Sequence, residues 1–227
     1  MEISPDNLIC WSYGPVTLNA TIVFTWLVMG IMTLCSWLVT RNLSTEVCIP
    51  PWQNFLESIV EGIHRQLREI LGYEIRGLYS FLTTLFLFIA VSNLLGAVPG
   101  FQSPTGSLST TIALAVCVLL ATPLYGIARV GFFPYFLNYM RPTPIMLPFN
   151  IMGELSRTMA LAVRLFGNVM SGSMISAVLL IVIPLIFPVL LQLLGLLTGM
   201  IQAYIFTVLA AIYIRAGMEV EQKRKTF

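Results

Sequence analysis

The sequence predicts an all-α integral membrane protein, with five transmembrane helices and one amphipathic surface helix in a single membrane domain over residues 1–227. Hydrophobic residues make up 57% of the chain and charged residues only 10%, whereas a soluble domain is usually about 25% charged. Residues 7–40, 77–128 and 165–214 contain no Asp, Glu, Lys or Arg. Because a membrane helix needs about 20 apolar residues, these stretches are long enough for several spans. The composition argues against a soluble globular protein, since a chain of this size could not bury so much apolar surface.

The first predicted span covers residues 17–40, and the polar stretch that follows contains a predicted amphipathic helix over residues 52–71. Apolar residues recur there at helical spacing, whereas charged residues fill the opposite face, where Glu61 and Arg65 can pair at i,i+4. The apolar face consists of Trp52, Phe55, Leu56, Ile59, Val60, Ile63, Leu67 and Ile70. Such a helix lies on the membrane surface or docks on a partner subunit, and the sequence leaves both interpretations open.

The apolar stretch 77–129 is too long for one span and predicts a hairpin of two spans. The turn is GAVPGFQSPTGS at 96–107, which contains prolines and glycines at turn-like spacing. The two spans are therefore expected at about 77–98 and 108–129. The proline-interrupted segment 131–148 is expected to be an irregular connection at the membrane interface.

Two long apolar segments, about 148–183 and 185–215, predict the last pair of helices, and a short cytoplasmic tail at 216–227 follows them. As helices they would be about 50 Å and 45 Å long, whereas the hydrocarbon core is only about 30 Å thick. Protrusion from the membrane would expose an almost wholly apolar segment to water. We therefore expect a steeply tilted helical hairpin over residues 148–215.

The positions of the basic residues predict the orientation of the chain. Arginines occur in the 41–76 loop and in the connection after the hairpin, and arginine and lysine occur in the tail, while the turns at 96–107 and 183–188 carry no charge. With five spans, all basic segments fall on one side of the membrane. We therefore expect the N-terminus outside and the C-terminus in the cytoplasm.

Arg164 places a permanent charge inside the first of the two long segments. In an upright helix it would lie at the inner interface, where an arginine reaches water at little cost. In a steeply tilted helix it would lie near mid-membrane, where a charge costs at least about 2.5–3.5 kcal/mol and marks a functional site. At about 100° per residue, Arg157, Asn168 and Ser171 share its face. We expect this polar stripe to face a partner or water, because two arginines against lipid would be costly.

The sequence predicts no catalytic, metal or cofactor site in this chain. It contains no Ser-His-Asp arrangement, no HExxH and no phosphate-binding Gly-rich loop, and its cysteines are scattered. The net charge of +2 does not indicate binding of nucleic acid. Glu154 is the only acid between Glu74 and Glu219. If the chain moves cations, the carrier carboxylate is therefore expected on another chain.

The segment PFNIMGELSRTMALAVRLFGNVMSG (148–172) closely resembles the long membrane helix of F-type ATP synthase subunit a, with RLFGN in the bacterial and chloroplast form. IQAYIFTVLAAIYI (201–214) is similar to the last helix of that family, and SNLLGAVPGFQSPTGSLSTTIALA (92–115) is similar to its membrane hairpin. The resemblance covers most of the chain after about residue 75. It implies a non-catalytic stator of the bacterial cell inner (plasma) membrane that contacts the rotating c-ring, the b subunits of the peripheral stalk, the lipid bilayer and the rest of the F1Fo ATP synthase. Two offset half-channels would couple proton or sodium flow to ring rotation and to ATP synthesis or hydrolysis.

The resemblance also implies roles for single residues. Arg164 would face the ring carboxylates, Asn93 would line the outer half-channel, and Gln202 would lie near the arginine on the last helix. Many bacterial relatives have an acid where this chain has Ser173, and some have a histidine on the last helix, so the outer path is neutral and fits sodium as well as protons. The complete set of expected ion-translocation residues is Arg164, Asn168, Gln202, Asn93 and Ser173, with Glu154, Ser156 and Arg157 toward the inner half-channel.

Two other functions remain open at the level of the sequence. One is a stand-alone channel or transporter whose intramembrane arginine binds an anion. The other is a structural membrane scaffold in which Arg164 is an interfacial anchor. The behaviour of Arg164 variants separates both from the stator function.

Overall fold

The computed structural model describes residues 9–13, 16–41, 51–72, 77–98, 101–132, 135, 146–182 and 187–219. The elements in this part of the chain are β1 (Ile9–Tyr13), β2 (Val16–Asn19), α1 (Ala20–Arg41), α2 (Pro51–Leu71), α3 (Leu78–Leu95), the 3-10 turn η2 (Pro104–Gly106), α4 (Leu108–Val130), α6 (Met146–Val182) and α7 (Phe187–Glu219). Among these described elements, α1, α3, α4, α6 and α7 are long and apolar enough to cross a membrane. The predicted class, five spans with a surface helix, is therefore confirmed.

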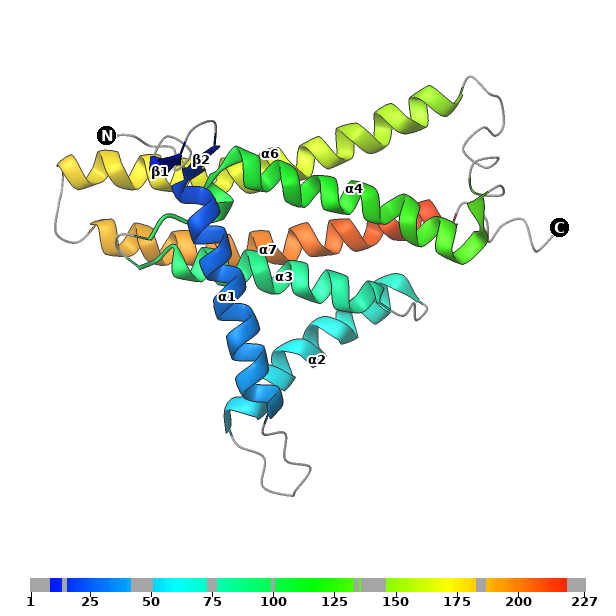
Figure 1. Cartoon of the computed structure of the whole chain (residues 1–227), viewed down its shortest axis with the longest axis horizontal. Coiled ribbons are helices and arrows are strands. Elements are labelled where there is room, and N and C mark those ends of the chain that lie inside the picture. The colour runs from blue at the N-terminus through cyan, green and yellow to red at the C-terminus, as the bar shows by residue number, and fades with distance from the viewer. Residues whose placement is uncertain are drawn as a thin grey trace.

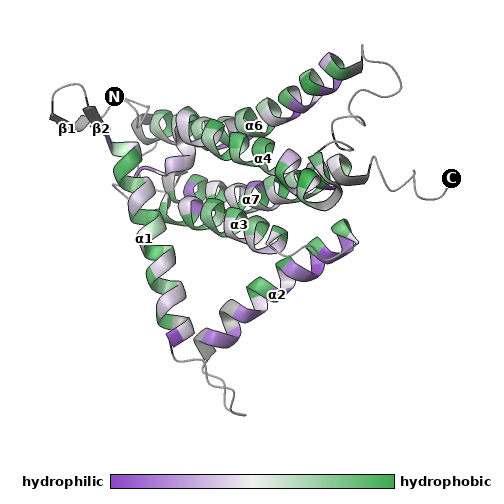
Figure 2. Cartoon of the chain, turned by 45° about the vertical axis from the view of Figure 1, so that its right-hand side comes forward, coloured by the Kyte–Doolittle hydropathy of each residue, from purple (hydrophilic) through white to green (hydrophobic). Residues whose placement is uncertain are grey.

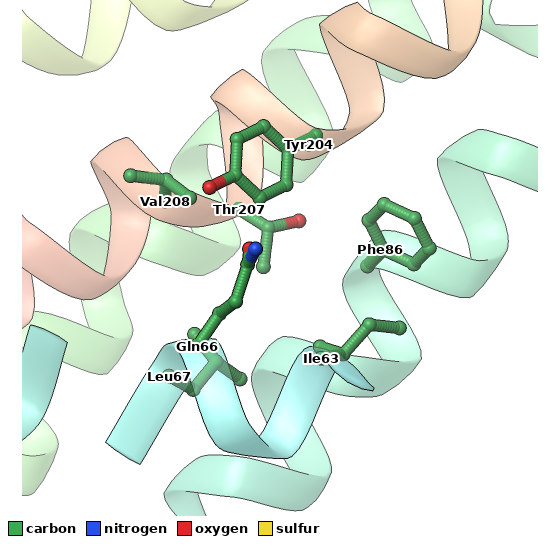
Figure 3. Close-up of a pocket in the computed structure, with 7 residues that line it drawn as sticks. All are labelled: Ile63, Gln66, Leu67, Phe86, Tyr204, Thr207 and Val208. Atoms are coloured by element: carbon green, nitrogen blue, oxygen red, sulfur yellow. The ribbon is translucent and has the colours of Figure 1, made fainter. Parts of the chain in front are cut away.

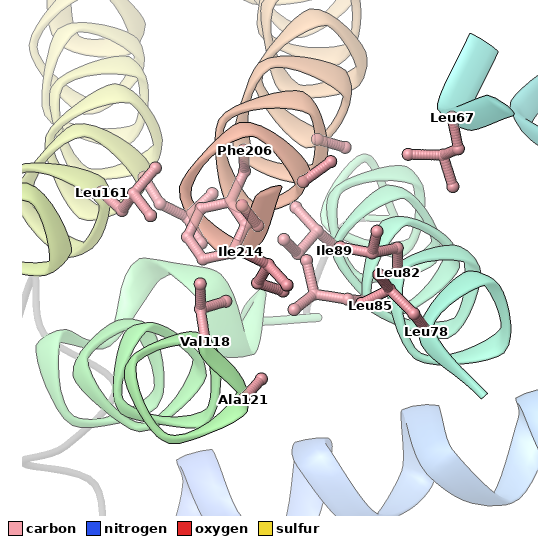
Figure 4. Close-up of a cluster of buried hydrophobic side chains, with 14 of the residues drawn as sticks. Leu67, Leu78, Leu82, Leu85, Ile89, Val118, Ala121, Leu161, Phe206 and Ile214 are labelled. Atoms are coloured by element: carbon pink, nitrogen blue, oxygen red, sulfur yellow. The ribbon is translucent and has the colours of Figure 1, made fainter. Parts of the chain in front are cut away.

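Four of these helices form two layers. Helices α6 and α7 lie over α4 and α3, with α7 in contact with both helices of the other layer (Figure 4). Helix α1 lies on the outer side of the α3–α4 layer and crosses the direction of the other spans steeply (Figure 1). The α6–α7 layer therefore has a broad face turned away from α1.

The core lies between the two layers, around α7. Phe206, Ala210 and Ile214 of α7 are fully buried against Leu82 and Ile89 of α3 (Figure 4). Alanines on α7 allow the helices to approach closely, which is how membrane helices associate when lipid provides no hydrophobic drive. Outside this core, large apolar side chains such as Trp26 and Leu34 of α1 are exposed, as expected of a surface solvated by lipid.

The two long helices have 37 residues in α6 and 33 in α7. At 1.5 Å per residue they are about 55 Å and 50 Å long, which exceeds the hydrocarbon thickness of about 30 Å. Both must therefore tilt strongly, and their crossing with α1 is consistent with this (Figure 1). Helix α7 continues to Glu219, into the predicted tail, while the rest of the tail and most of the predicted 131–148 connection lie outside the described residues.

A short β-hairpin was not predicted. Strands β1 and β2 pair antiparallel, with Tyr13 opposite Val16, and β2 covers residues that the sequence assigns to the start of the first span. Apolarity alone does not separate a strand from a helix over so few residues. The strands are joined in sequence by Gly14 and Pro15, which are residue types that favour turns, and α1 begins after them at Ala20.

Helix α2 has the amphipathic character that the sequence predicts, with its hydrophilic residues along one side (Figure 2). Glu61 and Arg65 form the expected pair, 3.4 Å apart, on the exposed face. Leu67 and Leu71 are buried in the core against α3 and α7. Arg215 of α7 donates a hydrogen bond to the Ile70 carbonyl, so the C-terminal ends of α2 and α7 are joined. The C-terminal half of α2 therefore docks on its own chain.

Where α2 meets α3 and α7 the packing leaves a small cavity (Figure 3). Gln66 extends toward Tyr204 and Thr207 of α7, while Leu67 and Phe86 supply apolar walls (Figure 3). The cavity has room for about one water molecule.

Candidate functional site

Arg164 lies midway along α6 on the exposed side of the helix. Its neighbours Leu161, Ala162 and Leu165 are buried, because they face the other helices of the bundle. Within the described part of the chain the Arg164 guanidinium makes no hydrogen bond and no ion pair. The charge is thus presented outward, beside exposed apolar side chains such as Met159 and Val163.

The other members of the polar stripe lie along the seam between α6 and α7. The Asn168 side-chain amide donates to the Thr198 carbonyl of α7 at 3.3 Å. The guanidinium carbon of Arg157 lies 5.8 Å from the ring centre of Tyr213, within the range of a cation–π contact. Ser171 and Arg157 are exposed, like Arg164. The stripe therefore follows the edge at which the exposed face of α6 meets α7.

Asn93 lies at the opposite side of α7, near the end of α3, and is 9% exposed. Its amide nitrogen donates to the Gly199 carbonyl at 2.9 Å, and its amide oxygen accepts from Thr105 at 2.8 Å. A Cβ at residue 199 would lie 3.1 Å from that of Asn93, so glycine is what permits this approach. Asn93 thus joins α3, the η2 turn and α7.

Gln202 lies on α7 one turn beyond Thr198 and is 6% exposed. Its amide nitrogen has no hydrogen-bond partner among the described residues. A buried amide without a partner costs about 1–3 kcal/mol. Since Asn168 binds Thr198 and Asn93 binds Gly199, three of the predicted residues gather around one turn of α7.

Comparison with known proteins identifies the family of the chain. The family model described as "ATP synthase A chain" matches residues 22–215. The chain belongs to the ATP synthase subunit a family. "ATP synthase subunit a 2" of Picosynechococcus sp. is 51% identical over 226 residues, which are 100% of this chain and 97% of the relative. "ATP synthase subunit a 2" of Acaryochloris marina is 56% identical over 222 residues, covering 98% of this chain and 95% of the relative. "ATP synthase subunit a" of Nitrosospira multiformis is 52% identical over 217 residues, covering 96% and 86%.

Membership in the subunit a family confirms the resemblance drawn from RLFGN and from the last helix. It makes the chain a multi-pass membrane component of the F-type ATP synthase, with a part in ATP synthesis and ion transport.

Ser173, Ser156 and Glu154 were also predicted as site residues, and the hydrogen bonds at Ser173 and at the Glu154 carbonyl stay within α6. Ser173 is exposed and donates locally to the Met170 carbonyl at 2.8 Å. Ser156 is exposed and makes no hydrogen bond within the described residues. Glu154 is half-buried near the start of α6, where its backbone carbonyl accepts from Thr158 at 2.9 Å. These positions stay predictions for the ion path.

Sequence reasoning missed several residues that hold the site together. Gly199 and Thr198 act through backbone carbonyls, which carry no signal in a motif. Ser103 and Thr105 lie in the segment predicted as a turn, and both belong to the Asn93 network. Tyr213 is an aromatic residue in an apolar helix, so its contact with Arg157 depends on the register between α6 and α7.

Proposed function

We propose that this subunit a is the ion-translocating stator of its ATP synthase, and that Arg164 faces the carboxylates of a rotating c-ring. The observation that carries the proposal is a permanent charge on an apolar exposed face, without a partner among the described residues. An arginine in this setting needs an opposite charge or water nearby. Since Arg164 makes no ion pair within the described residues, we assign its counter-charge to another chain.

The shape of the α6–α7 layer supports a large partner on this side. Both helices of this layer expose apolar residues, for example Met159 and Val163 on α6 and Ile201 on α7. Small residues such as Ala160 and Gly167 keep this part of α6 thin, which permits a second helix to approach closely. A ring of helical hairpins, each carrying one carboxylate, fits such a face.

The residue type follows from the chemistry. A guanidinium stays charged at any physiological pH, whereas a buried lysine can lose its proton. Facing a ring carboxylate at low dielectric, it favours the ionised form, so that the carboxylate releases its ion. The same charge repels a cation that would cross directly between two offset half-channels. One charge moving through 100 mV then supplies about 2.3 kcal/mol toward rotation.

The two half-channels are assigned to opposite sides of Arg164. Asn93, Ser173 and Gln202 belong to the outer path, whereas Glu154, Ser156 and Arg157 belong to the inner path, and Asn168 lies beside Arg164. The hydrogen bond from Arg215 to Ile70 supports the orientation, because it brings the α7 end and the basic 41–76 region to the same side. The chain thus lies in the bacterial inner membrane with its C-terminus in the cytoplasm, contacts the b subunits, and leaves the chemistry of ATP to other subunits.

Replacing Arg164 tests this function. In membranes that contain the whole complex, Arg164→Ala and Arg164→Lys are expected to reduce ATP-driven ion pumping at least about 100-fold, the equivalent of about 2.7 kcal/mol. Arg65→Gln is the matched control, because it removes an arginine from the exposed face of α2, and it is expected to pump normally. Coupled pumping that survives in both Arg164 variants would refute the proposal.

A stand-alone anion channel is the second candidate, since an exposed guanidinium is also an anion site. It requires conductance from the purified chain alone in liposomes. We expect no such conductance, and chloride flux that disappears in Arg164→Ala liposomes without c subunits would favour the channel over the stator.

A further inference from the structure

Four neutral oxygens form a continuous group where α3 ends and η2 begins. The Ser103 hydroxyl lies 3.0 Å from the Ser92 carbonyl oxygen and 2.6 Å from the Thr105 hydroxyl. The Thr105 hydroxyl lies 2.8 Å from the amide oxygen of Asn93. We call these four atoms the oxygen cluster. Asn93 alone was expected in an ion path, and the other three oxygens come from residues without an assigned role.

The orientation of Asn93 in the cluster is fixed by α7. Its Nδ2 donates to the Gly199 carbonyl, and a carbonyl oxygen can only accept. A flipped amide would place two acceptors against each other. The amide oxygen must therefore point at Thr105, which leaves both ends of the cluster, Ser92 O and Asn93 Oδ1, as acceptors.

The cluster has fewer hydrogens than oxygen–oxygen contacts. Each hydroxyl carries one hydrogen, so Ser103 and Thr105 together supply two hydrogens for three contacts. If Ser103 donates to Ser92 and Thr105 donates to Asn93, the 2.6 Å contact between the hydroxyls has none. If Ser103 donates to Thr105, the contact with Ser92 has none. Lone pairs therefore face each other in every arrangement.

The surroundings of the cluster favour weak binding of a cation. Thr105 and Ser92 are fully buried, so water does not solvate these oxygens freely. Two further buried oxygens in the same segments, Ser92 Oγ and Gln102 Oε1, have no hydrogen-bond partner among the described residues. Ser92 is in the last turn of α3, at the negative end of the helix dipole, although α4 begins nearby at Leu108 with its positive end.

We propose that the oxygen cluster binds a monovalent cation, Na⁺ or hydronium, in transit. Either ion removes the mismatch, because Na⁺ accepts lone pairs from several oxygens at once and hydronium donates hydrogen bonds to them. Neutral hydroxyl, amide and helix-end carbonyl oxygens are the ligands with which membrane proteins replace the hydration shell of such ions. Because no carboxylate takes part, the ion is held weakly enough to leave again.

The cluster would act before the ion reaches the rotor. It joins the end of α3 to the 96–107 turn, which the distribution of basic residues places on the outer side of the membrane. This inference rests on the proposed stator function, since a cation in transit here needs the ring carboxylate as its destination. It adds a selective step, in which the ion exchanges water for protein oxygens.

The test is the ion dependence of Thr105 variants in the assembled complex. Thr105→Val removes one ligand oxygen and one hydrogen at nearly unchanged shape, whereas Thr105→Ser keeps both and is the matched control. ATP synthesis driven by an ion gradient is measured in proteoliposomes against the Na⁺ concentration on the outer side of the complex at fixed pH, and against the pH on that side at fixed Na⁺. We expect Thr105→Val to raise the half-saturating concentration of one ion about tenfold, equal to about 1.4 kcal/mol, while Thr105→Ser stays within about twofold. Ser103→Ala should shift the same ion dependence.

The outcomes separate the ions and the hypotheses. A shift in the Na⁺ titration alone identifies Na⁺, and a shift in the pH titration alone identifies hydronium. A lower maximal rate in Thr105→Val and Ser103→Ala with both half-saturating concentrations unchanged would overturn the inference, because it shows a purely structural role. The proposed function fails independently, if Arg164→Ala retains coupled pumping whatever the Thr105 variants do.

Discussion

Single residues in this subunit a act through the helix surfaces that present them. Arg164 has buried neighbours on the bundle side of α6, so the helix phase alone turns its charge outward. Asn93, by contrast, is held by hydrogen bonds on both sides of its amide. The first residue is free to meet the proposed ring, while the second fixes α7 relative to α3 and η2. Gly199 makes the second arrangement possible.

Gly199→Ala tests the contact between α3 and α7. The new Cβ would lie 3.1 Å from the Cβ of Asn93 and 3.2 Å from its Nδ2, so the helices must separate by a few tenths of an ångström. We expect a destabilisation of about 1–3 kcal/mol, as for other overpacked sites, seen as a lower melting temperature of the purified complex.

Gly195→Ala is the control on the same helix, because a Cβ there meets nothing within 4 Å. Alanine is the better helix former by about 1 kcal/mol, so this variant should be as stable as the parent or slightly more so. Equal melting temperatures for the two variants would contradict a tight Asn93–Gly199 contact.

At the scale of elements, the two halves of α2 have different surroundings. Its C-terminal half buries Leu67 and Leu71 against α3 and α7, and Arg215 binds the carbonyl at its end. Toward its N-terminus Ile59 and Val60 are only half-buried. The sequence left open whether the apolar face meets lipid or protein, and the structure assigns the C-terminal half to this chain itself.

Leu71→Ala is expected to loosen the docked half of α2. Removal of a fully buried leucine side chain costs about 2–5 kcal/mol, part of which should appear as local opening. Hydrogen exchange of the α2 amides near residues 66–71 should therefore accelerate in the assembled complex. Val60→Ala, at a half-buried position of the same helix, should change exchange there little, and equal acceleration in both variants would argue against docking through the C-terminal half.

For the whole molecule, features that depend on composition and helical periodicity could be predicted from the sequence. Features that depend on contacts between distant residues could not. Five spans follow from apolar lengths, and the outward face of Arg164 follows from helical phase. The β1–β2 hairpin was not predicted, because a run of four or five residues fits a strand as well as the end of a helix. The hydrogen bonds to Thr198 and Gly199 were not predicted either, because they join backbone carbonyls to side chains far away in the sequence. Only the packing of the helices shows which carbonyl each side chain reaches.

The layered packing also predicts which side of the molecule meets the rotor. Val163 is exposed next to Arg164 on α6, whereas Leu34 is exposed on α1. Helix α1 lies on the far side of α3 and α4 from the α6–α7 layer (Figure 4). In a background without native cysteines, we expect Val163→Cys to form a disulfide with a cysteine on the outward helix of a c subunit near its carboxylate, since the Cα atoms of the two cysteines can come within about 7 Å. Leu34→Cys is equally exposed to the membrane but should stay uncrosslinked, because α3 and α4 lie between it and the ring. Non-reducing gels measure both crosslinks. A crosslink from Leu34→Cys with none from Val163→Cys would contradict the placement of the rotor against the α6–α7 layer.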